Sequence, residues 1–302
     1  MVKYNQQPNK IITINKKDIY CFQSGIKNEN LDKKTVESFG EEWSKFANFN
    51  KQEISKIGDE YFDIVNSNHL NENSIVLDLG CGSGRWTKYL SPKVKFIEAV
   101  DPSDAVLSAS QFLSENKNVR VSKSSVDNIP FQNNSFDFAF SLGVLHHIPN
   151  TEKALTKVVE KVKINGWVLI YLYYSLDNRG ILYKFIFQIS CIPRFFISKM
   201  PSKIKHILCE IIAFIVYVPL ITLASILKGV FKNKFYTKIP LSYYVGKSLN
   251  VVRNDALDRF GTPLEQRFSK KEIKQMMENS GLGEIIFSNK QPFWHAIGKR
   301  IK

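Results

Sequence analysis

The sequence contains little cysteine and little arginine, and both shortages limit what the protein can be. Its 302 residues include four scattered cysteines and no C-x-x-C pair: Cys21, Cys81, Cys191 and Cys209. This pattern excludes a disulfide-stapled scaffold and a cysteine zinc site, and it fits a reducing compartment. The opening residues, MVKYNQQPNK, lack the apolar run of a secretory signal. We therefore expect a cytoplasmic protein, with peripheral attachment to a membrane as an open alternative.

Basic charge exceeds acidic charge, but lysine supplies most of the excess. Lys and Arg total 42 against 28 Asp and Glu, a net charge of +14, and only eight of the 42 are arginine. A lysine excess is typical of a solvated surface and is weak evidence for nucleic-acid binding. The charge is also uneven, because nine basic residues but only one acid, Glu210, lie between Gly180 and Pro240. This unusually apolar segment therefore carries +8 of the total.

Apolar runs alternate with helical patterns from residue 71 onward. Strands are predicted at 75–77, 96–100, 119–122, 136–142, 167–173, 284–288 and 293–298. Apolar strands that alternate with helices indicate a parallel sheet covered on both faces. We predict an α/β fold with a doubly wound, mostly parallel seven-stranded sheet, an amino-terminal extension and a helical apolar insert after the fifth strand.

The same patterns divide the chain into four parts. Residues 1–70 predict a helical amino-terminal extension, and residues 71–178 predict a Rossmann-like core that binds the cofactor. Residues 179–248 predict a helical cap or insert. Residues 249–302 predict the carboxy-terminal completion of the core sheet.

A glycine-rich turn follows the first strand of the core. Residues 78–84 read DLGCGSG and lead into a helix. Glycine lets the backbone turn sharply and lets a ligand lie against it. Arg85 stands where a dinucleotide-binding turn has its third glycine, and the Asp78 carboxylate would repel a pyrophosphate. The turn therefore argues against NAD and favours a ligand that carries an ammonium or sulfonium group.

A second acid, Asp101, ends the next strand, 17 residues after Gly84. An acid at this position of a doubly wound sheet accepts hydrogen bonds from ribose hydroxyls. A glycine turn, an acid that faces an ammonium group and an acid that faces a ribose together describe S-adenosylmethionine.

Three stretches resemble successive motifs of one family. VLDLGCGSGRW, EAVDPSDAVL and IPFQNNSFDFAFSLGVLHHIPN resemble motifs of class I, seven-stranded S-adenosylmethionine-dependent methyltransferases. The resemblance is to the methyltransferase type 11 group, which includes ubiquinone- and menaquinone-biosynthesis methyltransferases. It covers residues 74–174 and, more weakly, 250–300. It implies a Rossmann-like fold and methyl transfer from S-adenosylmethionine.

The resemblance also implies roles for individual residues. The glycine turn would lie under the methionine moiety, Asp101 would hold the ribose, and Leu142 would line the cofactor. Ser125 and Val126 fall where the family contacts adenine. Members of the family usually have an acid at the position of Ser125, so Asp127 or the backbone could recognise the ring instead. The predicted cofactor-binding residues are Asp78, Gly80, Cys81, Gly82, Gly84, Asp101, Pro102, Ser125, Val126 and Leu142.

Methyl transfer is an in-line displacement, and positioning supplies much of its rate. A base is needed only if the acceptor must lose a proton, and His146 and His147, just after the fourth strand, are the candidate catalytic residues. Either histidine could instead hydrogen-bond the backbone of its loop. Two adjacent histidines without a third ligand predict no metal site. Four residues after the fifth strand could reach the acceptor or only line its rim: Tyr173, Tyr174, Asp177 and Arg179.

Nucleic acid is a disfavoured acceptor. Residues 141–144 read SLGV where amino-directed DNA methyltransferases resemble one another in an Asn/Asp-Pro-Pro-aromatic motif, and no Pro-Cys pair occurs for base-carbon methylation. The basic charge lies among aliphatic residues, which offer no platform for base stacking.

Residues 181–238 contain two long apolar stretches. Ile211–Leu227 is 17 uncharged residues, at the lower edge of transmembrane length. A single crossing would separate the fifth strand from the last two, which must pair in one sheet, so a lid and a contact with an anionic membrane both remain open. We expect methyl transfer to a small, apolar or lipid-linked acceptor. The alternative is a membrane-surface or ligand-binding protein on a catalytically retired methyltransferase fold.

Overall fold

A computed structural model describes residues 1–22, 30–45, 50–230 and 234–302. The chain forms two compact units: unit 1 is Met1–Asp177 with Leu264–Lys302, and unit 2 is Asn178–Pro263. The second unit extends further than the predicted insert, because helix α9 (Leu249–Gly261) belongs to it and not to the sheet-bearing part.

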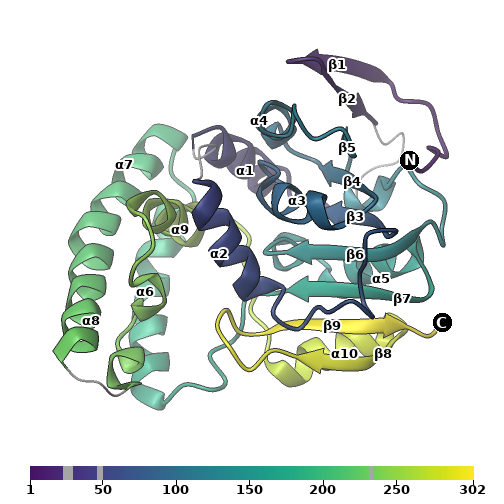
Figure 1. Ribbon diagram of the computed structural model, residues 1–302. Helices are drawn as coiled ribbons and strands as arrows, with labels where there is room; N and C mark the ends of the chain where they lie inside the picture. The colour runs from purple at the N-terminus through teal and green to yellow at the C-terminus, as the bar shows by residue number, and fades with distance from the viewer. Residues whose placement is uncertain (23–29, 46–49, 231–233) are drawn as a thin grey trace. The chain divides into compact units, whose positions relative to one another are not determined.

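Unit 1 is built around one mixed sheet (Figure 1), whose strand order is β1-β2-β5-β4-β3-β6-β7-β9-β8. Neighbouring strands from β2 to β7 are parallel, and the pairs β1–β2, β7–β9 and β8–β9 are antiparallel. The strands are β1 (Lys10–Ile14), β2 (Lys17–Cys21), β3 (Ile75–Leu79), β4 (Phe96–Asp101), β5 (Val119–Lys123), β6 (Phe136–Leu142), β7 (Val162–Tyr171), β8 (Leu282–Phe287) and β9 (His295–Arg300).

The sheet has nine strands where we predict seven, and the two additional ones are β1 and β2. They lie in the part that the sequence analysis assigns to a helical extension. Asn15 and Lys16 join them with φ of 47° and 64°, which is the geometry of a two-residue type I′ turn. Ile19 of β2 is fully buried and pairs with Val121 of β5. Because the turn contains no glycine, this hairpin carries no strong sequence signal.

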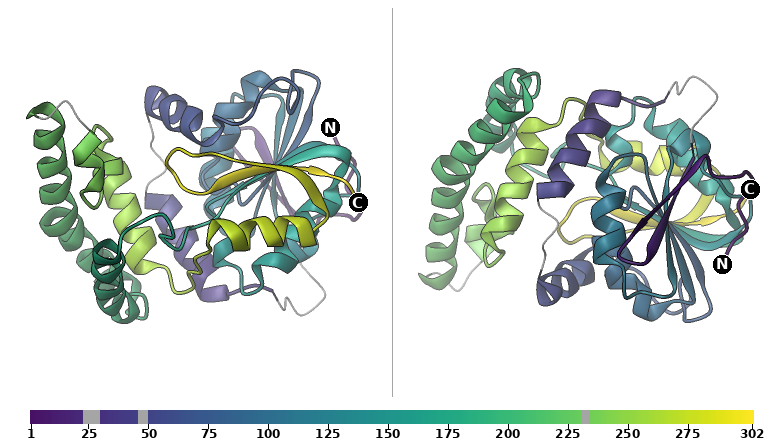
Figure 2. Two further views of the ribbon diagram at one scale, coloured as in Figure 1. Left: turned by 90° about the horizontal axis from the view of Figure 1, so that it is seen from below. Right: turned by 90° about the horizontal axis from the view of Figure 1, so that it is seen from above.

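Helices cover both faces of the sheet (Figure 2). On one face α5 (Thr151–Lys161) and α10 (Lys270–Asn279) share a core with strand residues such as Leu77, Ala139 and Val168. The opposite face carries α2 (Lys51–Tyr61), α3 (Arg85–Leu90) and α4 (Ala105–Phe112). This arrangement is doubly wound and places the ends of β3, β4 and β6 at one edge.

The regular elements in the described part of unit 2 are all helices. Its elements are α6 (Ile181–Ile197), α7 (Ser202–Ile212), η4 (Ala213–Tyr217), α8 (Val218–Val230), η5 (Lys234–Lys238), η6 (Ser242–Tyr244) and α9. The elements from α7 to α8 form one continuous helix, Ser202–Val230. Among the described residues, this 29-residue helix alone is long and apolar enough to cross a membrane, and only 22% of its most apolar window is buried.

Candidate functional site

The two acids that the sequence singles out lie at the carboxyl ends of neighbouring parallel strands. Asp78 is near the end of β3, and Asp101 is the last residue of β4. Both are buried, with 1% and 8% of their surface exposed. Two carboxyl groups so placed need either hydrogen-bond donors or a positive ligand.

Asp78 has one hydrogen-bond donor among the described residues, and its pKa is strongly shifted. Thr87 Oγ1, on α3, donates a 2.5 Å hydrogen bond to a carboxylate oxygen of Asp78. Burial, opposed by the Thr87 hydrogen bond and assisted by the charge of Asp101, raises the pKa of Asp78 to about 8. A cation beside the group would favour its ionised form. The position therefore suits a positively charged ligand.

Three hydrogen bonds hold Asp101. Its Oδ1 accepts from the Ser103 N–H (2.8 Å) and from Ser103 Oγ (2.6 Å), and its Oδ2 accepts from the Gly82 N–H (2.9 Å). A carboxylate offers about four acceptor positions. One hydroxyl of a ribose can therefore bind Oδ2 directly, while a second would require the Ser103 hydroxyl to turn away. Burial raises the pKa of Asp101, and these hydrogen bonds oppose the rise.

The glycine turn is fixed by β4 and has no room for side chains. The N–H groups of Gly80 and Cys81 donate to the Val100 carbonyl, at 2.7 and 3.1 Å. Gly80 has φ of 81°, and a Cβ there would lie 2.4 Å from the side chain of Val144. Gly84, with φ of 83°, would place a Cβ 2.6 Å from Leu113. Burial raises the pKa of the Cys81 thiol well above its ordinary value, so the thiol stays neutral.

Helix α1 (Lys33–Lys45), for which the sequence analysis gives no role, lies against the loops that follow β3, β4 and β6. The indole nitrogen of Trp43 is 3.1 Å from the position that a Cβ on Gly82 would take. A Cβ on Gly40 would lie 3.5 Å from the Asp104 backbone nitrogen. The Phe39 ring meets the His147 ring edge-on, with centroids 4.8 Å apart. The helix therefore covers the edge where both acids lie.

The predicted adenine contacts lie after β5. Ser125 Oγ is buried and has no hydrogen-bond partner among the described residues, and Val126 is buried next to it. Asp127, the alternative contact, accepts a hydrogen bond from the Asn30 N–H at 3.2 Å. An unpartnered buried hydroxyl fits a polar ligand edge such as that of adenine.

The remaining predicted contacts are apolar. Leu142 is buried at the end of β6, and half-buried Pro102 follows Asp101 directly. Both therefore lie at the same edge of the sheet as the acids, where they can shape a site but cannot hydrogen-bond a ligand through their side chains.

His146 and His147 are both buried, and the backbone fixes their tautomers. His147 Nδ1 is 2.6 Å from the Leu264 carbonyl, which can only accept, so in neutral His147 this nitrogen carries the proton and Nε2 has the lone pair. His146 Nδ1 accepts from the Tyr173 N–H at 3.4 Å, so in neutral His146 the proton is on Nε2. Burial, with smaller contributions from His147 and Arg267, holds the pKa of His146 well below its ordinary range.

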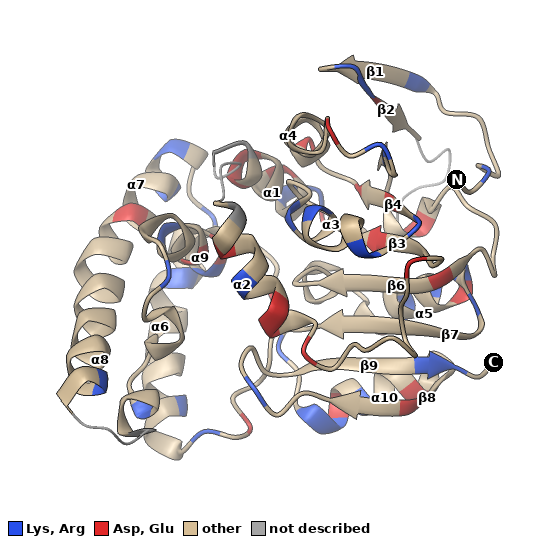
Figure 3. Ribbon diagram, viewed as in Figure 1, with Lys and Arg blue, Asp and Glu red and all other residues tan. Residues whose placement is uncertain are grey.

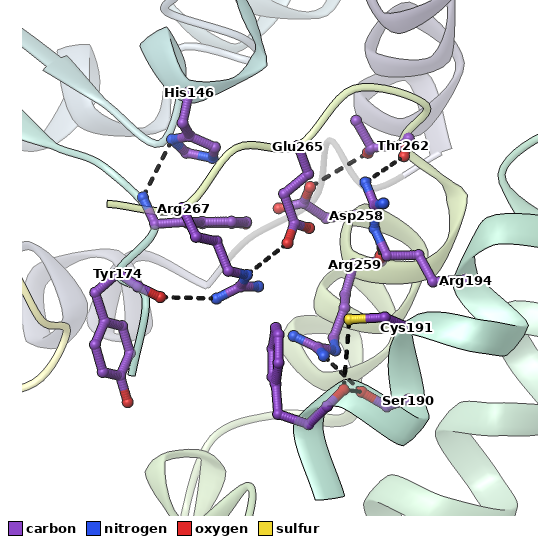
Figure 4. Close-up of polar contacts among 12 residues, drawn as sticks. His146, Tyr174, Ser190, Cys191, Arg194, Asp258, Arg259, Thr262, Glu265 and Arg267 are labelled. Carbon is purple, nitrogen blue, oxygen red and sulfur yellow. Dashed lines mark hydrogen bonds and ion pairs between the residues drawn. The ribbon is translucent and has the colours of Figure 1, made fainter. Parts of the chain in front are cut away.

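The segment after α9 supports the histidine pair (Figure 4). Gln266 donates its N–H to the His146 carbonyl at 3.0 Å. Arg267 forms a 2.6 Å ion pair with Glu265 and donates to the Tyr174 carbonyl at 3.3 Å. Its guanidinium also lies 5.1 Å from the ring centroid of Tyr173. Among the described residues, no group of three or more His, Cys, Asp and Glu could hold a metal ion.

Two of the rim candidates have other contacts. Asp177 accepts from Trp294 Nε1 (2.8 Å) and from the Lys270 N–H (2.9 Å) at the start of α10. Arg179 belongs to unit 2 and donates to the Thr237 carbonyl at 3.2 Å. Four residues of the site are not predicted from the sequence: Thr87, Ser103, Glu265 and Arg267. Ser103 is only two residues from Asp101 and could have been found as its hydrogen-bond donor, whereas the contacts of Thr87 with Asp78 and of Arg267 with Tyr173 appear only in the folded chain.

Comparison with known proteins gives a consistent family for the central part of the chain. Residues 77–170 match the family model described as a methyltransferase domain. Phosphoethanolamine N-methyltransferase 2 of Caenorhabditis elegans is 34% identical over 102 residues, which is 32% of this chain and 23% of that protein. The tRNA (carboxymethyluridine(34)-5-O)-methyltransferase of Saccharomyces cerevisiae is 32% identical over 101 residues, 32% of this chain and 35% of that protein.

The chain thus spans about a quarter to a third of the length of these two relatives. Among solved structures, the YcgJ protein of Bacillus subtilis has a TM-score of 0.48 and 14% identity, covering 84% of this chain and all of that one.

Proposed function

We propose, because residues 77–170 belong to the methyltransferase domain family, that the protein transfers a methyl group from S-adenosylmethionine to a small, apolar or lipid-linked acceptor. The observation that carries the proposal is the pair of buried acids on adjacent strand ends around a glycine turn. One acid, with its raised pKa, suits a cation, and the other keeps a free acceptor position for a hydroxyl.

S-Adenosylmethionine supplies a methyl group on a positively charged sulfur. Three residues of this chain fit three parts of the cofactor. Asp78 would face the cationic end, Asp101 would accept hydrogen bonds from the ribose hydroxyls, and Ser125 would contact the adenine. Gly80 and Gly84 keep the turn free of side chains. Trp43 of α1, which lies against Gly82, would exclude water from the covered edge.

The two histidines have different roles in this proposal. His147 Nε2 has the lone pair that a general base needs, and Leu264 holds the ring in that tautomer. His146 stays neutral and offers the Nε2 hydrogen as a donor that can orient the acceptor. The base acts only if the acceptor must lose a proton, as a hydroxyl or an acidic carbon does. For any other acceptor, positioning alone would supply the rate.

The connections to unit 2 support an apolar acceptor. Phe268 donates its N–H to the Tyr173 carbonyl (2.8 Å), and Ser175 donates its N–H to the Phe268 carbonyl (2.9 Å). The segment that precedes unit 2 in the chain therefore lies beside the segment that follows it. The returning chain also supplies Leu264, which holds His147. The segment of unit 1 that follows unit 2 in the chain thus holds His147 in place.

The test uses S-adenosylmethionine labelled in its methyl group. The full-length protein is incubated separately with a lipid extract, an aqueous small-molecule extract and bulk tRNA. The proposal expects label in the lipid extract, lost in Asp101→Ala and retained in the matched control Asp104→Ala, whose exposed side chain pairs with Lys123.

Two outcomes contradict the proposal in different ways. Label in tRNA would mean that this chain acts on the kind of acceptor named for its yeast relative. It would contradict the proposal of an apolar acceptor. Cofactor binding without label in any fraction would favour a binding protein on a retired fold.

A further inference from the structure

The long helix of unit 2 has its large apolar residues on the outside. Nine large apolar residues of this helix are exposed: Ile204, Ile207, Ile211, Phe214, Ile215, Val216, Leu223, Ile226 and Val230. The buried residues of the same helix are Lys205, Cys209, Ala213, Tyr217 and Ala224. A helix of a water-soluble domain normally shows the reverse pattern, with large aliphatic residues inside.

Helix α6 repeats this arrangement. Its exposed apolar residues are Ile181, Leu182, Phe185, Ile186, Ile189, Ile192, Phe195 and Phe196. Its polar residues contact α9 instead: Arg194 donates to the carbonyls of Arg259 (3.0 Å) and Thr262 (2.9 Å), and Ser190 accepts from Arg259 at 2.8 Å. Figure 4 shows these contacts.

The interior of unit 2 contains further polar contacts around α9. Asp255 accepts hydrogen bonds from the hydroxyls of Tyr217 (2.9 Å) and Tyr244. Arg253 binds both carboxylate oxygens of Glu210 at 2.7 Å. Small and polar groups inside with large aliphatic groups outside are typical of helices whose outer faces contact lipid.

The exposed charge of these helices is positive. Lys199 and Lys203 flank the turn between α6 and α7, and Lys228 and Lys238 lie near the end of α8; all four are exposed. The one acid of α6 to α8 is Glu210, and Arg253 neutralises it. Figure 3 shows that the middle of each helix is uncharged. The exposed apolar residues are thus bordered by four exposed lysines.

The topology of unit 1 limits how such a surface can meet a membrane. Strand β7, which precedes unit 2, pairs with β9, which follows it, from Trp167↔Lys299 to Tyr171↔His295. Both ends of unit 2 must therefore be on the same side of a bilayer. A single crossing by the long helix is incompatible with this pairing, whereas a helix that lies in the interface satisfies it.

We propose that unit 2 binds the surface of an anionic lipid bilayer. The outward faces of α6 and of Ser202–Val230 enter the boundary between headgroups and acyl chains, and the four exposed lysines contact the anionic headgroups. The apolar contact supplies affinity that salt does not affect, and the lysines supply a part that salt weakens. The proposal does not depend on methyl transfer.

The test is co-sedimentation of the full-length protein with sucrose-loaded vesicles of phosphatidylcholine alone or with 30% phosphatidylglycerol, without cofactor. We expect binding to the anionic vesicles, weakened by high salt. Lys199→Gln with Lys203→Gln should lower the partition coefficient by roughly 10- to 30-fold. The matched control, Lys153→Gln with Lys271→Gln, changes two exposed lysines of unit 1 and should bind as the unmodified protein does.

A second pair of variants tests the apolar contact. The triple change Ile207→Gln, Ile211→Gln and Ile226→Gln should lower binding by more than about 100-fold. Its control, Ile11→Gln, Ile164→Gln and Ile286→Gln, alters equally exposed isoleucines of unit 1 and should leave binding unchanged.

Three results would overturn the proposal: a full-length protein that stays in the supernatant, control variants that lose as much binding as the test variants, or equal binding to neutral vesicles. If the protein ignores vesicles but self-associates, and the isoleucine variant is monomeric, the occupant of this surface is a second copy of the chain. Binding of S-adenosylhomocysteine, measured on every variant, reports separately on unit 1 and on the proposed function.

Discussion

The hydroxyl of Thr87 donates a 2.5 Å hydrogen bond to the carboxylate of Asp78, which links α3 to the end of β3. This contact lowers the pKa of Asp78, but burial raises it more, to about 8. The protein without ligand therefore holds a largely protonated carboxyl group at neutral pH. A positively charged ligand would restore the charge of the Asp78 carboxylate. The ligand-free protein thus retains a binding residue whose burial lowers the free energy of unfolding.

Replacing Asp78 with Asn should stabilise the ligand-free protein in a pH-dependent way. The unfolded chain loses the Asp78 proton near pH 4, whereas the folded protein keeps it to about pH 8, so the free energy of unfolding falls as pH rises between these values. Asp78→Asn removes this loss. It should raise the free energy of unfolding by roughly 2–4 kcal/mol above pH 8 and change it little below pH 4.

Urea unfolding at pH 4, 6 and 8.5 measures this difference. The same variant should lose S-adenosylhomocysteine binding in calorimetry. If the difference in free energy of unfolding between the variant and the unmodified protein were no larger at pH 8.5 than at pH 4, the raised pKa of Asp78 would be contradicted.

Asp101 and Ser103 should have unequal effects on cofactor affinity. Asp101→Ala removes a charged acceptor and should weaken binding of S-adenosylhomocysteine by ~1.5–3 kcal/mol. Ser103→Ala frees an acceptor position on Oδ1, so affinity should stay the same or rise. Calorimetry measures both values, and a Ser103→Ala variant as weak as Asp101→Ala would mean that the hydroxyl itself contacts the ligand.

The assigned tautomers predict different losses for the two histidines. His147→Asn should lower the single-turnover rate ~10²–10⁴-fold if the acceptor loses a proton, with cofactor affinity unchanged. His146→Asn removes one donor and should cost roughly 10-fold. Rapid-quench kinetics with the methyl acceptor found in the labelling experiment would distinguish the two losses of rate. Small effects at both positions would leave positioning as the source of the rate.

Within unit 2, Tyr244→Phe should destabilise the helices around α9. It removes a hydrogen bond to the half-buried Asp255 carboxylate, which should cost about 1–3 kcal/mol. Burial raises the pKa of Asp255, so the loss should be larger above that pKa, where the carboxylate is charged. Hydrogen exchange over residues 249–261 measures the change. Tyr236→Phe, which keeps the ring beneath Lys228, is the control and should leave the exchange of α9 unaltered.

The sequence predicts those parts of the fold whose signals are local. The order of the strands from residue 75 is confirmed. The Asn150 cap of α5 and the capping box of Ser269 and Glu272 are local signals of the same kind, since each depends on a few neighbouring residues. The methyltransferase family of the central segment is also confirmed. The individual site residues remain predictions, although Asp78 and Asp101 do come to neighbouring strand ends.

What the sequence does not predict depends on contacts between distant residues or on unusual backbone. The β1–β2 turn uses Lys16 in a left-handed conformation without glycine. The tautomer of His147 is set by Leu264, which is 117 residues away along the chain. The polarity of unit 2 is likewise hidden, because a helical repeat of apolar residues does not say which face is outward.

The pairing of β7 with β9 also affects how the chain folds during synthesis. His295 is 124 residues further along than its partner Tyr171, so the edge of β7 stays open for roughly 6–25 s of translation. The fully buried residues Val168, Leu169 and Ile170 lie on that strand, and an open apolar edge favours pairing between chains. The same interval delivers the apolar helices of unit 2. We therefore expect nascent chains that stall before residue 295 to aggregate or bind chaperones, and chains released after β9 to stay monomeric.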